Sequence, residues 1–513
     1  MENSQRQLVE IPMNRVEGDL EIRVAAEGGT VTDAWVVAPM FRGFERLLVG
    51  RGAMDGLVIT PRICGMCNMS HLSAAVTALD AIAGATVPDN GRRLRNVVLM
   101  AENVQSDMRH TFLLFAPDLV NAVYQSHTLH AEAVRRYEPL KGETAVQVIQ
   151  ETKHLLELVA LLGGQWPNSA FMVPGGVSAN PGPSELLQCR HVVKRFRNWY
   201  EQRVLGCNLE RWSALRSVDD FDSWLDESES HANSEVGFFV RFAREARLDR
   251  IGKGHGNFLS YGSLPLPSST WVTAPRGGWL VAPGFRGSAG LQEMDHTRIA
   301  EHVSRSWFVD YPGARHPFQG ETNPYASGSE AGKYSWAKAP RFDGLPAETG
   351  PLAERVTAGD PLFEELLSRA GGPNVMLRQL ARMTRPAMLL AALETWLSEM
   401  VKNPGPFYQR PVEIPDGSGA GMVMAARGAL GHWVTVENGK LSGYQVITPT
   451  SWNGSPRDSN GTRGPIEEAL VGTPMRDPDN PVELGHVVRS FDPCMVCCVH
   501  VHRNGRVNAK VRV

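Results

Sequence analysis

Two cysteine pairs, one near each end of the chain, carry most of the information in this sequence. The first pair stands in Arg62-Ile63-Cys64-Gly65-Met66-Cys67-Asn68-Met69-Ser70-His71, and the second in Asp492-Pro493-Cys494-Met495-Val496-Cys497-Cys498-Val499-His500. Two intervening residues let both thiolates of a pair reach one ion, because the turn between them brings the sulfurs to the same side. Four thiolates make a soft site that suits zinc, an iron–sulfur cluster or nickel.

A structural zinc site is the simplest alternative, and the cysteine spacing alone leaves it open. Two features favour another metal. The pairs of a zinc site are usually ~15–20 residues apart, whereas these pairs lie at opposite ends of the chain. Each pair is also followed by a histidine and stands beside Arg62 or Asp492, and a closed structural site needs no such ionisable neighbours. A thioredoxin-like motif fits less well, because it needs one pair near a βαβ unit rather than two.

The composition excludes several classes of protein. Of the 513 residues, 42% are hydrophobic, which is ample for a large core. The 52 basic and 55 acidic side chains leave a net charge of −3, without the basic excess of a nucleic-acid binder. Seven cysteines, four of them in the two pairs, indicate metal or redox work in a reducing compartment rather than a disulfide framework.

The same sequence features lead to an expected location. No run approaches the roughly 18 apolar residues of a membrane span, and the stretch from Met1 to Gln7 lacks the apolar core of a signal peptide. We therefore expect a cytoplasmic chain with no transmembrane segment of its own, which a partner could export or hold at a membrane.

The hydrophobic patterns predict an α+β fold. Residues 19–39 alternate as a β-hairpin does around Glu27-Gly28-Gly29. Apolar residues at spacings of three and four predict long helices, with Pro117 and Pro386 as bends; these helices cover residues 90–123, 144–162, 184–216 and 374–402. Residues 308–360 have no clear period, and residues 411–448 return to strand-like alternation. We expect one large, mostly helical unit with long core helices and small peripheral sheets.

The motifs together resemble the large subunit of nickel–iron hydrogenases. The two cysteine motifs match its two signatures, and further matches cover most of the chain. They are Asn14-Arg15-Val16-Glu17-Gly18-Asp19, Phe41-Arg42-Gly43-Phe44-Glu45, Gly163-Gly164-Gln165-Trp166-Pro167, Ala426-Arg427-Gly428-Ala429-Leu430-Gly431-His432-Trp433 and Pro449-Thr450-Ser451-Trp452-Asn453. The block 163–167, with His231-Ala232-Asn233-Ser234, is most similar to the cyanobacterial-type uptake branch.

The resemblance implies a bimetallic site and the fold of that family. Nickel would take all four thiolates, with Cys64 and Cys494 as terminal ligands. Cys67 and Cys497 would bridge to an iron that carries one CO and two cyanides. Splitting dihydrogen heterolytically needs a Lewis-acidic metal and a nearby base. The Cys494 thiolate would receive the proton and pass it to Glu17. Three cysteines match no ligand position and are expected to be small buried apolar residues: Cys189, Cys207 and Cys498.

The resemblance also assigns residues around the metals. Arg427 would overhang them near the cyanides, because its fork of donors suits an anionic diatomic ligand, with Asp118 and Asp492 around it. Thr450 would donate a hydroxyl to the other cyanide, Leu430 would form an apolar wall, and His71 would orient a bridging thiolate. Glu45 and His500 would bind a magnesium or iron ion near the C-terminus, together with a backbone carbonyl near Val446 or Ile447.

Two positions depart from the family pattern. Ala425-Ala426 stands where many members have Ala-Pro, so the loop before Arg427 is expected to be less rigid. Asn168 stands where many members have a histidine that faces the partner's proximal cluster, which puts any proton or electron role of that position in doubt.

The implied function is that of an uptake hydrogenase, which cleaves H2 into protons and electrons and passes the electrons to an iron–sulfur small subunit. The iron–sulfur clusters would belong to that partner alone. Residues 1–500 would form the catalytic domain, and a maturation endopeptidase would remove residues 501–513 after assembly proteins have loaded nickel and iron.

Two rivals share this fold. An H2-sensing regulatory subunit is the alternative, but sensors commonly carry Gln where this chain has His71. The related subunit of respiratory complex I lacks the four cysteines.

Overall fold

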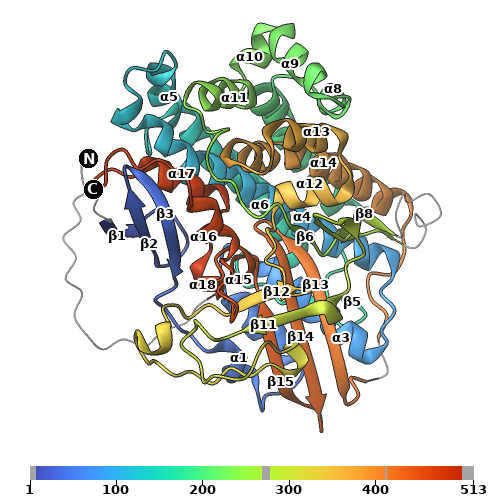
Figure 1. The fold of residues 1–513 in the computed structure, drawn as a ribbon. Helices are drawn as coiled ribbons and strands as arrows, with labels where there is room; N and C mark the ends of the chain where they lie inside the picture. Colours follow the sequence, from blue (N-terminus) through green and yellow to red (C-terminus); the bar gives the residue numbers. More distant parts are fainter. Residues whose placement is uncertain (1–6, 268–277, 411–412, 499–513) are drawn as a thin grey trace.

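Four long helices pack against one another at the centre of the molecule (Figure 1). They are α4 (Asp89–Arg109), α6 (Glu143–Gly163), α7 (Pro183–Trp199) and α14 (Val375–Lys402). The computed structural model describes residues 7–267, 278–410 and 413–498, without the side chains of Cys497 and Cys498. Within these ranges the predicted α+β architecture, with long core helices and small sheets around them, is confirmed.

The apolar stripe predicted for α4 is the face that the helix buries. Leu94, Val97, Val98 and Met108 are each 0% exposed. The helix changes character near Pro117, which cannot donate a backbone hydrogen bond. It becomes a π-helix over His110–Phe115 and then a 3₁₀ turn over Ala116–Val120. Such π-turns occur frequently at functional sites, and this one places His110 beside the second cysteine motif.

Two of the helix predictions need correction. The single helix expected over residues 184–216 is divided, because Gly206 has a left-handed φ of 73° and separates the end of the segment that begins with α7 from α8 (Leu209–Ser213). Pro386 lies inside α14, and the helix continues on both sides of it. The helices α9 (Val218–Glu227), α10 (Glu229–Asn233) and α11 (Glu235–Glu245) were not predicted.

The N-terminal hairpin forms as expected and gains a third strand. β2 (Leu20–Glu27) pairs with β3 (Thr30–Val37) in antiparallel register, and the chain reverses at Gly28 and Gly29 with φ values of 57° and 73°. β1 (Gln7–Met13), which was not predicted, pairs with the other edge of β2. In Figure 1 this sheet lies on the left, next to the C-terminal helices; α16 (Pro465–Leu470) contacts β3.

The second antiparallel sheet supports the first cysteine motif. It consists of β13 (Gly417–Ala425), β14 (Gly428–Glu437) and β15 (Lys440–Ile447), and α3 (Asn68–Ala83) packs across β13 and β14. The packing is so close that a Cβ atom on Gly421 would lie 1.9 Å from the carbonyl oxygen of Ala74. Glycine at this position therefore lets the sheet approach the helix that begins directly after Cys67.

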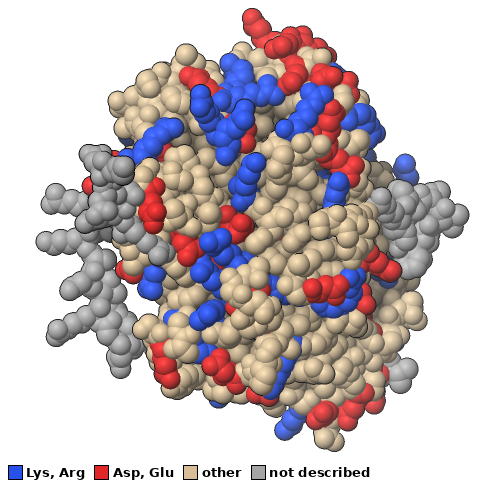
Figure 2. All heavy atoms as spheres, viewed as in Figure 1, with Lys and Arg blue, Asp and Glu red and all other residues tan. Residues whose placement is uncertain are grey.

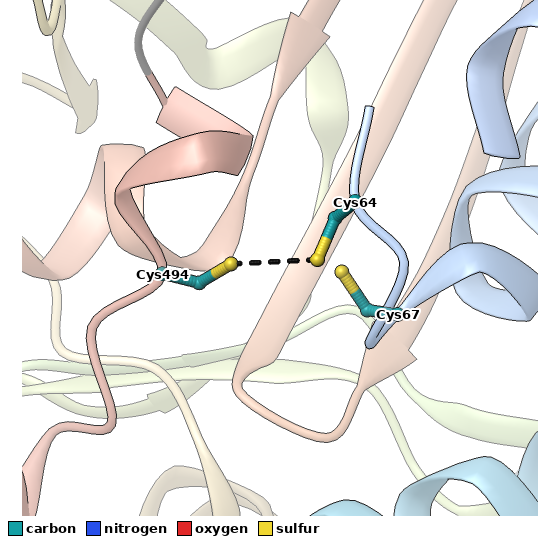
Figure 3. Close-up of side chains that lie close together, drawn as sticks. All are labelled: Cys64, Cys67 and Cys494. Atoms are coloured by element: carbon teal, nitrogen blue, oxygen red, sulfur yellow. Dashed lines mark hydrogen bonds between the residues drawn. The ribbon is translucent and has the colours of Figure 1, made fainter. Parts of the chain in front are cut away.

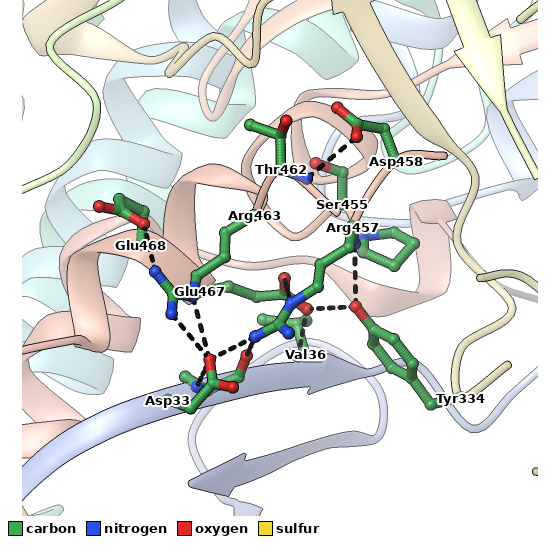
Figure 4. A network of polar contacts seen from close by, with 12 residues as sticks. Asp33, Val36, Tyr334, Ser455, Arg457, Asp458, Thr462, Arg463, Glu467 and Glu468 are labelled. Atoms are coloured by element: carbon green, nitrogen blue, oxygen red, sulfur yellow. Dashed lines mark hydrogen bonds and ion pairs between the residues drawn. The ribbon is translucent and has the colours of Figure 1, made fainter. Parts of the chain in front are cut away.

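The segment predicted as irregular, residues 308–360, contains only short elements until α12 (Pro351–Ala358). A polar network helps to fix it (Figure 4). Tyr334 donates its hydroxyl to Glu467 at 2.8 Å, and Glu467 also accepts the amide of Val36 at 3.0 Å. Arg457 and Arg463 both bind Asp33 of β3. The network thus connects this segment, β3 and the loop that follows α15 (Pro449–Asn453).

The surface agrees with a nearly balanced charge. On the face drawn in Figure 2, basic and acidic side chains are interspersed over the helices and the sheet. None of the helices in the described part of the chain combines the length and the apolar character that a membrane crossing requires.

Candidate metal centre

Three sulfurs from opposite ends of the chain meet in the interior (Figure 3). The Sγ atoms of Cys64, Cys67 and Cys494 lie within 4.8 Å of one another, and those of Cys64 and Cys494 are 3.5 Å apart. All three side chains are buried, and none is in a disulfide. Cys497 lies in the short helix α18 (Met495–Cys498), but its side chain is outside the described part of the structure, as is the whole of His500. This is the one such group of potential metal ligands among the described residues.

A buried carboxylate holds the first cysteine loop. Glu102, on α4, is 0% exposed and receives hydrogen bonds from the backbone amides of Met69 and Ser70 at 2.8 and 3.0 Å. The Ser70 hydroxyl and the Asn68 side chain donate to it at 2.8 and 3.1 Å. The two backbone amides belong to the first turn of α3, where they have no partner within the helix. Burial raises the pKa of Glu102 to about 8, against the opposing effect of these hydrogen bonds. Glu102 was not identified from the sequence.

Arg42 joins the two cysteine loops. Its guanidinium donates to the carbonyl oxygens of Ile63 and Arg62 at 2.6 and 2.9 Å, and to that of Val496 at 3.2 Å. One side chain therefore fixes the backbone on both sides of the sulfur cluster. Arg42 belongs to the motif Phe41-Arg42-Gly43, which was recognised in the sequence without a role for the arginine.

The second cysteine loop is held by the N-terminal segment and by α15. The carbonyl oxygen of Glu17 accepts the amide of Met495 at 2.6 Å, and the Thr450 hydroxyl oxygen accepts the amide of Cys494 at 2.9 Å. A Cβ atom on Gly18, whose φ is 84°, would lie 2.9 Å from the backbone of Val496. Gly18 therefore permits this close approach. Thr450, assigned by resemblance to a cyanide, contacts the cysteine loop in this structure.

Arg427 and Asp492 form a buried ion pair that faces the sulfurs. Arg427 Nε donates to Asp492 Oδ1 at 3.0 Å, and His110 Nδ1 lies 3.0 Å from the same oxygen. Burial by itself would lower the pKa of Arg427, but the charges of Asp492 and the three cysteines outweigh burial and raise it well above the ordinary value. Burial by itself would raise the pKa of Asp492. The charges of Arg427 and His110 outweigh burial, so the pKa of Asp492 lies well below its ordinary value.

Several polar atoms around the cluster have no hydrogen-bond partner although they are buried. They include Arg427 Nη1, Asp492 Oδ2 and His71 Nε2. Such orphaned groups are costly unless something occupies the space that they face. Soft thiolates suit a thiophilic metal. A guanidinium with an unpaired N–H donor suits an anionic ligand on that metal. The donors present therefore fit a centre of nickel and iron.

The Glu17 side chain is half-buried near the cluster. Burial raises the pKa of its carboxyl group, and the negative charge of Cys64 adds to the effect, while Arg427 lowers it. A carboxyl group whose pKa is raised from the usual acidic range can take and release protons nearer neutrality.

His71 belongs to a chain of buried polar side chains. Its Nδ1 lies 3.1 Å from Nε2 of His432, whose Nδ1 lies 2.8 Å from the Tyr444 hydroxyl. Burial lowers the pKa of His71 to about 4, so the ring is neutral near pH 7. Leu430 is 1% exposed and packs in an apolar cluster with Ala74.

The position predicted for Asp118 is wrong. Asp118 does not pair with Arg427; its carboxylate binds Arg489 Nη1 at 2.7 Å and Arg15. The 3₁₀ turn after the π-helix directs the carboxylate towards α17 (Val482–Ser490), which carries Arg489. The residue of this region that reaches the Arg427–Asp492 pair is His110.

Glu45 lies at a small cavity of about 40 Å³ that Glu301 and Lys338 also line. Its Oε1 accepts the backbone amide of Val446 at 2.9 Å, and Lys338 Nζ lies 3.7 Å from a carboxylate oxygen of each glutamate. The neighbours of Glu45 in the structure are thus the Glu301 carboxylate and the Lys338 ammonium group. Its expected partner His500 lies outside the described residues.

Asn168 contacts the first cysteine loop from outside. Its backbone amide donates to the Asn68 side chain at 3.1 Å, and its φ is +67°. His231, part of another recognised motif, stacks on Trp224 and has a packing role.

Comparison with known proteins agrees with this geometry. A family profile described as nickel-dependent hydrogenase matches residues 42–140 and 143–500. The periplasmic [NiFeSe] hydrogenase large subunit of Desulfomicrobium baculatum is 33% identical, covering 96% of this chain and 94% of that protein. The uptake hydrogenase large subunit of Rhodobacter capsulatus is 28% identical, covering 98% and 96%.

The expected cytoplasmic location is wrong by this comparison. A relative that matches over 96% of this chain is a periplasmic protein by name. The prediction rested on the first residues of the given sequence, and that feature does not decide the location.

A solved structure gives the same result in three dimensions. The Ni-Fe-Se hydrogenase of D. vulgaris Hildenborough in the reduced state superposes with a TM-score of 0.81 at 30% identity, covering 97% of this chain and all of that one. The fold, the buried sulfur cluster and the family profile therefore agree, and the chain belongs to the nickel-dependent hydrogenase family as a large subunit.

Proposed function

We propose that this chain cleaves dihydrogen into protons and electrons at a nickel–iron centre held by Cys64, Cys67, Cys494 and Cys497. The observation that carries the proposal is the buried cluster of three sulfurs within 4.8 Å, assembled from both ends of the chain and faced by the Arg427–Asp492 pair. We also propose that the chain belongs to the cyanobacterial-type uptake branch of the family, on the basis of residues 163–167 and 231–234.

The bound metals would polarise dihydrogen and accept its electrons, and the protein would manage the proton and the ligands. Cys494 would take the proton, and Glu17, whose carbonyl already binds the loop of Cys494, would carry it away. The unpartnered Nη1 of Arg427 would donate to an anionic iron ligand, either of the two cyanides proposed beside one CO. Leu430 and its apolar neighbours would keep water from the iron.

Substitution of a ligand tests the proposal against a matched control. Cys64→Ser should abolish H2-dependent dye reduction by the purified complex. Cys189→Ser should retain it, because Cys189 is also buried but lies on α7, and burial raises the pKa of its thiol to about 12. Retained H2 oxidation in Cys64→Ser would end the proposal, and equal loss in both variants would show a general effect on folding.

An iron–sulfur small subunit would receive the electrons. The cysteine loop approaches the surface, because Gly65 and Arg62 are exposed although Cys64 is buried. Just before it, α1 (Phe44–Leu48), α2 (Asp55–Ile59) and the residues that flank them leave large apolar side chains exposed; these are Leu47, Val49, Met54 and Val58, at 44–50%. Such a patch is typical of a protein interface. Co-purification should yield a heterodimer or a multiple of it, and a metal-loaded lone large subunit with full dye reduction would contradict this.

The tail would be removed during maturation. Residues 501–513 contain Arg503, Arg506, Lys510 and Arg512 and no acid, so their loss takes the net charge from −3 to −7, that is, 48 basic minus 55 acidic residues. With nickel and iron inserted by assembly proteins, an endopeptidase would cut after His500, which would then bind a magnesium or iron ion with Glu45. The intact mass of the active protein tests this: an active enzyme that retains residues 501–513 would refute it.

A further inference from the structure

The turn that carries Arg427 lacks the backbone conformation usual for its length. Ala425, the last residue of β13, pairs with Gly428, the first residue of β14, so Ala426 and Arg427 form a two-residue hairpin turn. Such turns favour positive φ at one or both central residues, which matches the twist of the strands. Neither Ala426 nor Arg427 has a positive φ, and the positive value of 126° falls on Gly428 instead. Contacts from outside the hairpin add to what holds this turn.

A buried arginine supplies contacts to one side of the turn. Arg385 of α14 donates from Nη2 to the carbonyl oxygen of Ala426 at 2.7 Å, and its Nη1 lies 3.5 Å from that of Ala425. The guanidinium is itself fixed by a two-point contact with Asp107 at 2.7 and 2.8 Å, and by Glu354 at 3.2 Å. Its side chain is 2% exposed and the carboxylate of Asp107 0%. Two core helices thereby anchor the turn.

The other side of the turn is closed by the segment before α12. Thr349 Oγ1 accepts the amide of Ala429 at 2.8 Å. A Cβ atom on Gly428 would lie 2.5 Å from that oxygen and 2.7 Å from the amide of Gly350. The backbone therefore cannot relax in this direction, and the contacts of Arg385 decide how the turn lies.

We infer that Arg385 is a positioning residue, which fixes the Ala425–Ala426 backbone and thereby aims the guanidinium of Arg427 at the metal ligands. The inference rests on the proposed function. The Arg427 side chain has a hydrogen bond from Nε to Asp492 and none from Nη1, so the direction of its fork depends on the backbone that carries it. Position 426 is alanine, so no proline ring restrains φ at the first central residue of the turn.

Arg385→Lys tests the inference, because one ammonium group cannot bind Asp107 at two points and reach the turn as well. We expect nickel and iron at the parent level, cyanide stretching bands that shift and broaden, and H2 oxidation lowered roughly 10²-fold, as for a displacement of about 1 Å in a positioned group. The matched control is Arg136→Lys. Arg136 is equally buried, pairs with buried Glu235 and binds one carbonyl oxygen, but it lies on α5 (His130–Tyr137). Its bands should not move.

A rescue separates positioning from a general loss of packing. Ala426→Pro in the Arg385→Lys background should return the bands to the parent positions and recover at least about tenfold of the rate. Proline presets φ near −65° and suits the first central position of a turn, and Ala425 already has the extended conformation that a residue before proline needs.

A second variant leaves the buried arginine in place. Ala426→Gly removes only the local stiffness of the turn, so with Arg385 present we expect activity within about threefold of the parent. Parental bands and rate in Arg385→Lys, an equal band shift in Arg136→Lys, or a hundredfold loss in Ala426→Gly would each overturn the inference. A parent protein that lacks nickel and cyanide bands would instead overturn the proposed function.

Discussion

Removal of the Glu102 carboxylate should loosen the N-terminus of α3, directly after Cys67. The carboxylate accepts four hydrogen bonds, two of them from the buried backbone amides of Met69 and Ser70. Glu102→Ala leaves the two amides without a partner, at about 1–3 kcal/mol for each buried group. The two amides alone therefore correspond to about 2–6 kcal/mol of local stability. Because 1.4 kcal/mol is about a factor of ten, we expect their protection from exchange to fall at least 30-fold.

Amide hydrogen exchange measures this loss of protection directly at the backbone amides of Met69 and Ser70. Peptides that contain Met69 and Ser70 should exchange faster in Glu102→Ala, and the nickel content should fall as Cys67 loses its fixed position. Glu185→Ala is the control, because Glu185 also binds a backbone amide at a helix N-terminus, that of Gly182 at 2.7 Å, but is exposed. Exchange at Met69 and Ser70 within threefold of the parent would refute the role of Glu102.

Two further predictions concern protons. Glu17→Gln should keep the nickel and iron content and lower H2 oxidation by roughly 10²-fold or more, whereas a parental rate in Glu17→Gln together with an inactive Arg427→Lys would place the proton route at the arginine. Burial raises the pKa of Glu467 from 4.5 to about 7, so the folded chain keeps a proton that the unfolded chain releases. The free energy of unfolding should therefore fall, by up to about 3 kcal/mol, as the pH rises from about 4.5 to 7. Glu467→Gln retains the acceptor for Val36 and Tyr334, and its melting temperature should lose most of this dependence; an unchanged slope would contradict the assignment.

Much of the fold follows from local patterns in the sequence. The apolar stripe of α4 and the alternation of apolar and polar residues in β2 and β3 are clear in the sequence, because each element buries one face. The divided helix after α7 was missed because one glycine, Gly206, decides it. The helices α9 to α11 were missed because they are short. Their starts are marked by polar N-cap residues, which a search for long apolar stripes does not detect.

Some residues of the candidate metal centre could be identified from the sequence, and others could not. The spacing within each cysteine pair pointed to the sulfurs, and the resemblance of the motifs to a known family assigned Arg427 and Asp492. Glu102, His110 and Arg385 were not found, since each acts through a contact between elements distant in the sequence. Asp118 was placed wrongly for the same reason: its partners are fixed by how the π-helix packs on α17, which no local pattern reveals.

Metal content is the most direct test of the central claim that the sulfur cluster holds a nickel–iron centre. Elemental analysis of the purified complex should give about one nickel per large subunit, and Cys64→Ser should lose that nickel while Cys189→Ser keeps it. Zinc in place of nickel in the parent protein, or nickel retained at the parent level in Cys64→Ser, would contradict the claim.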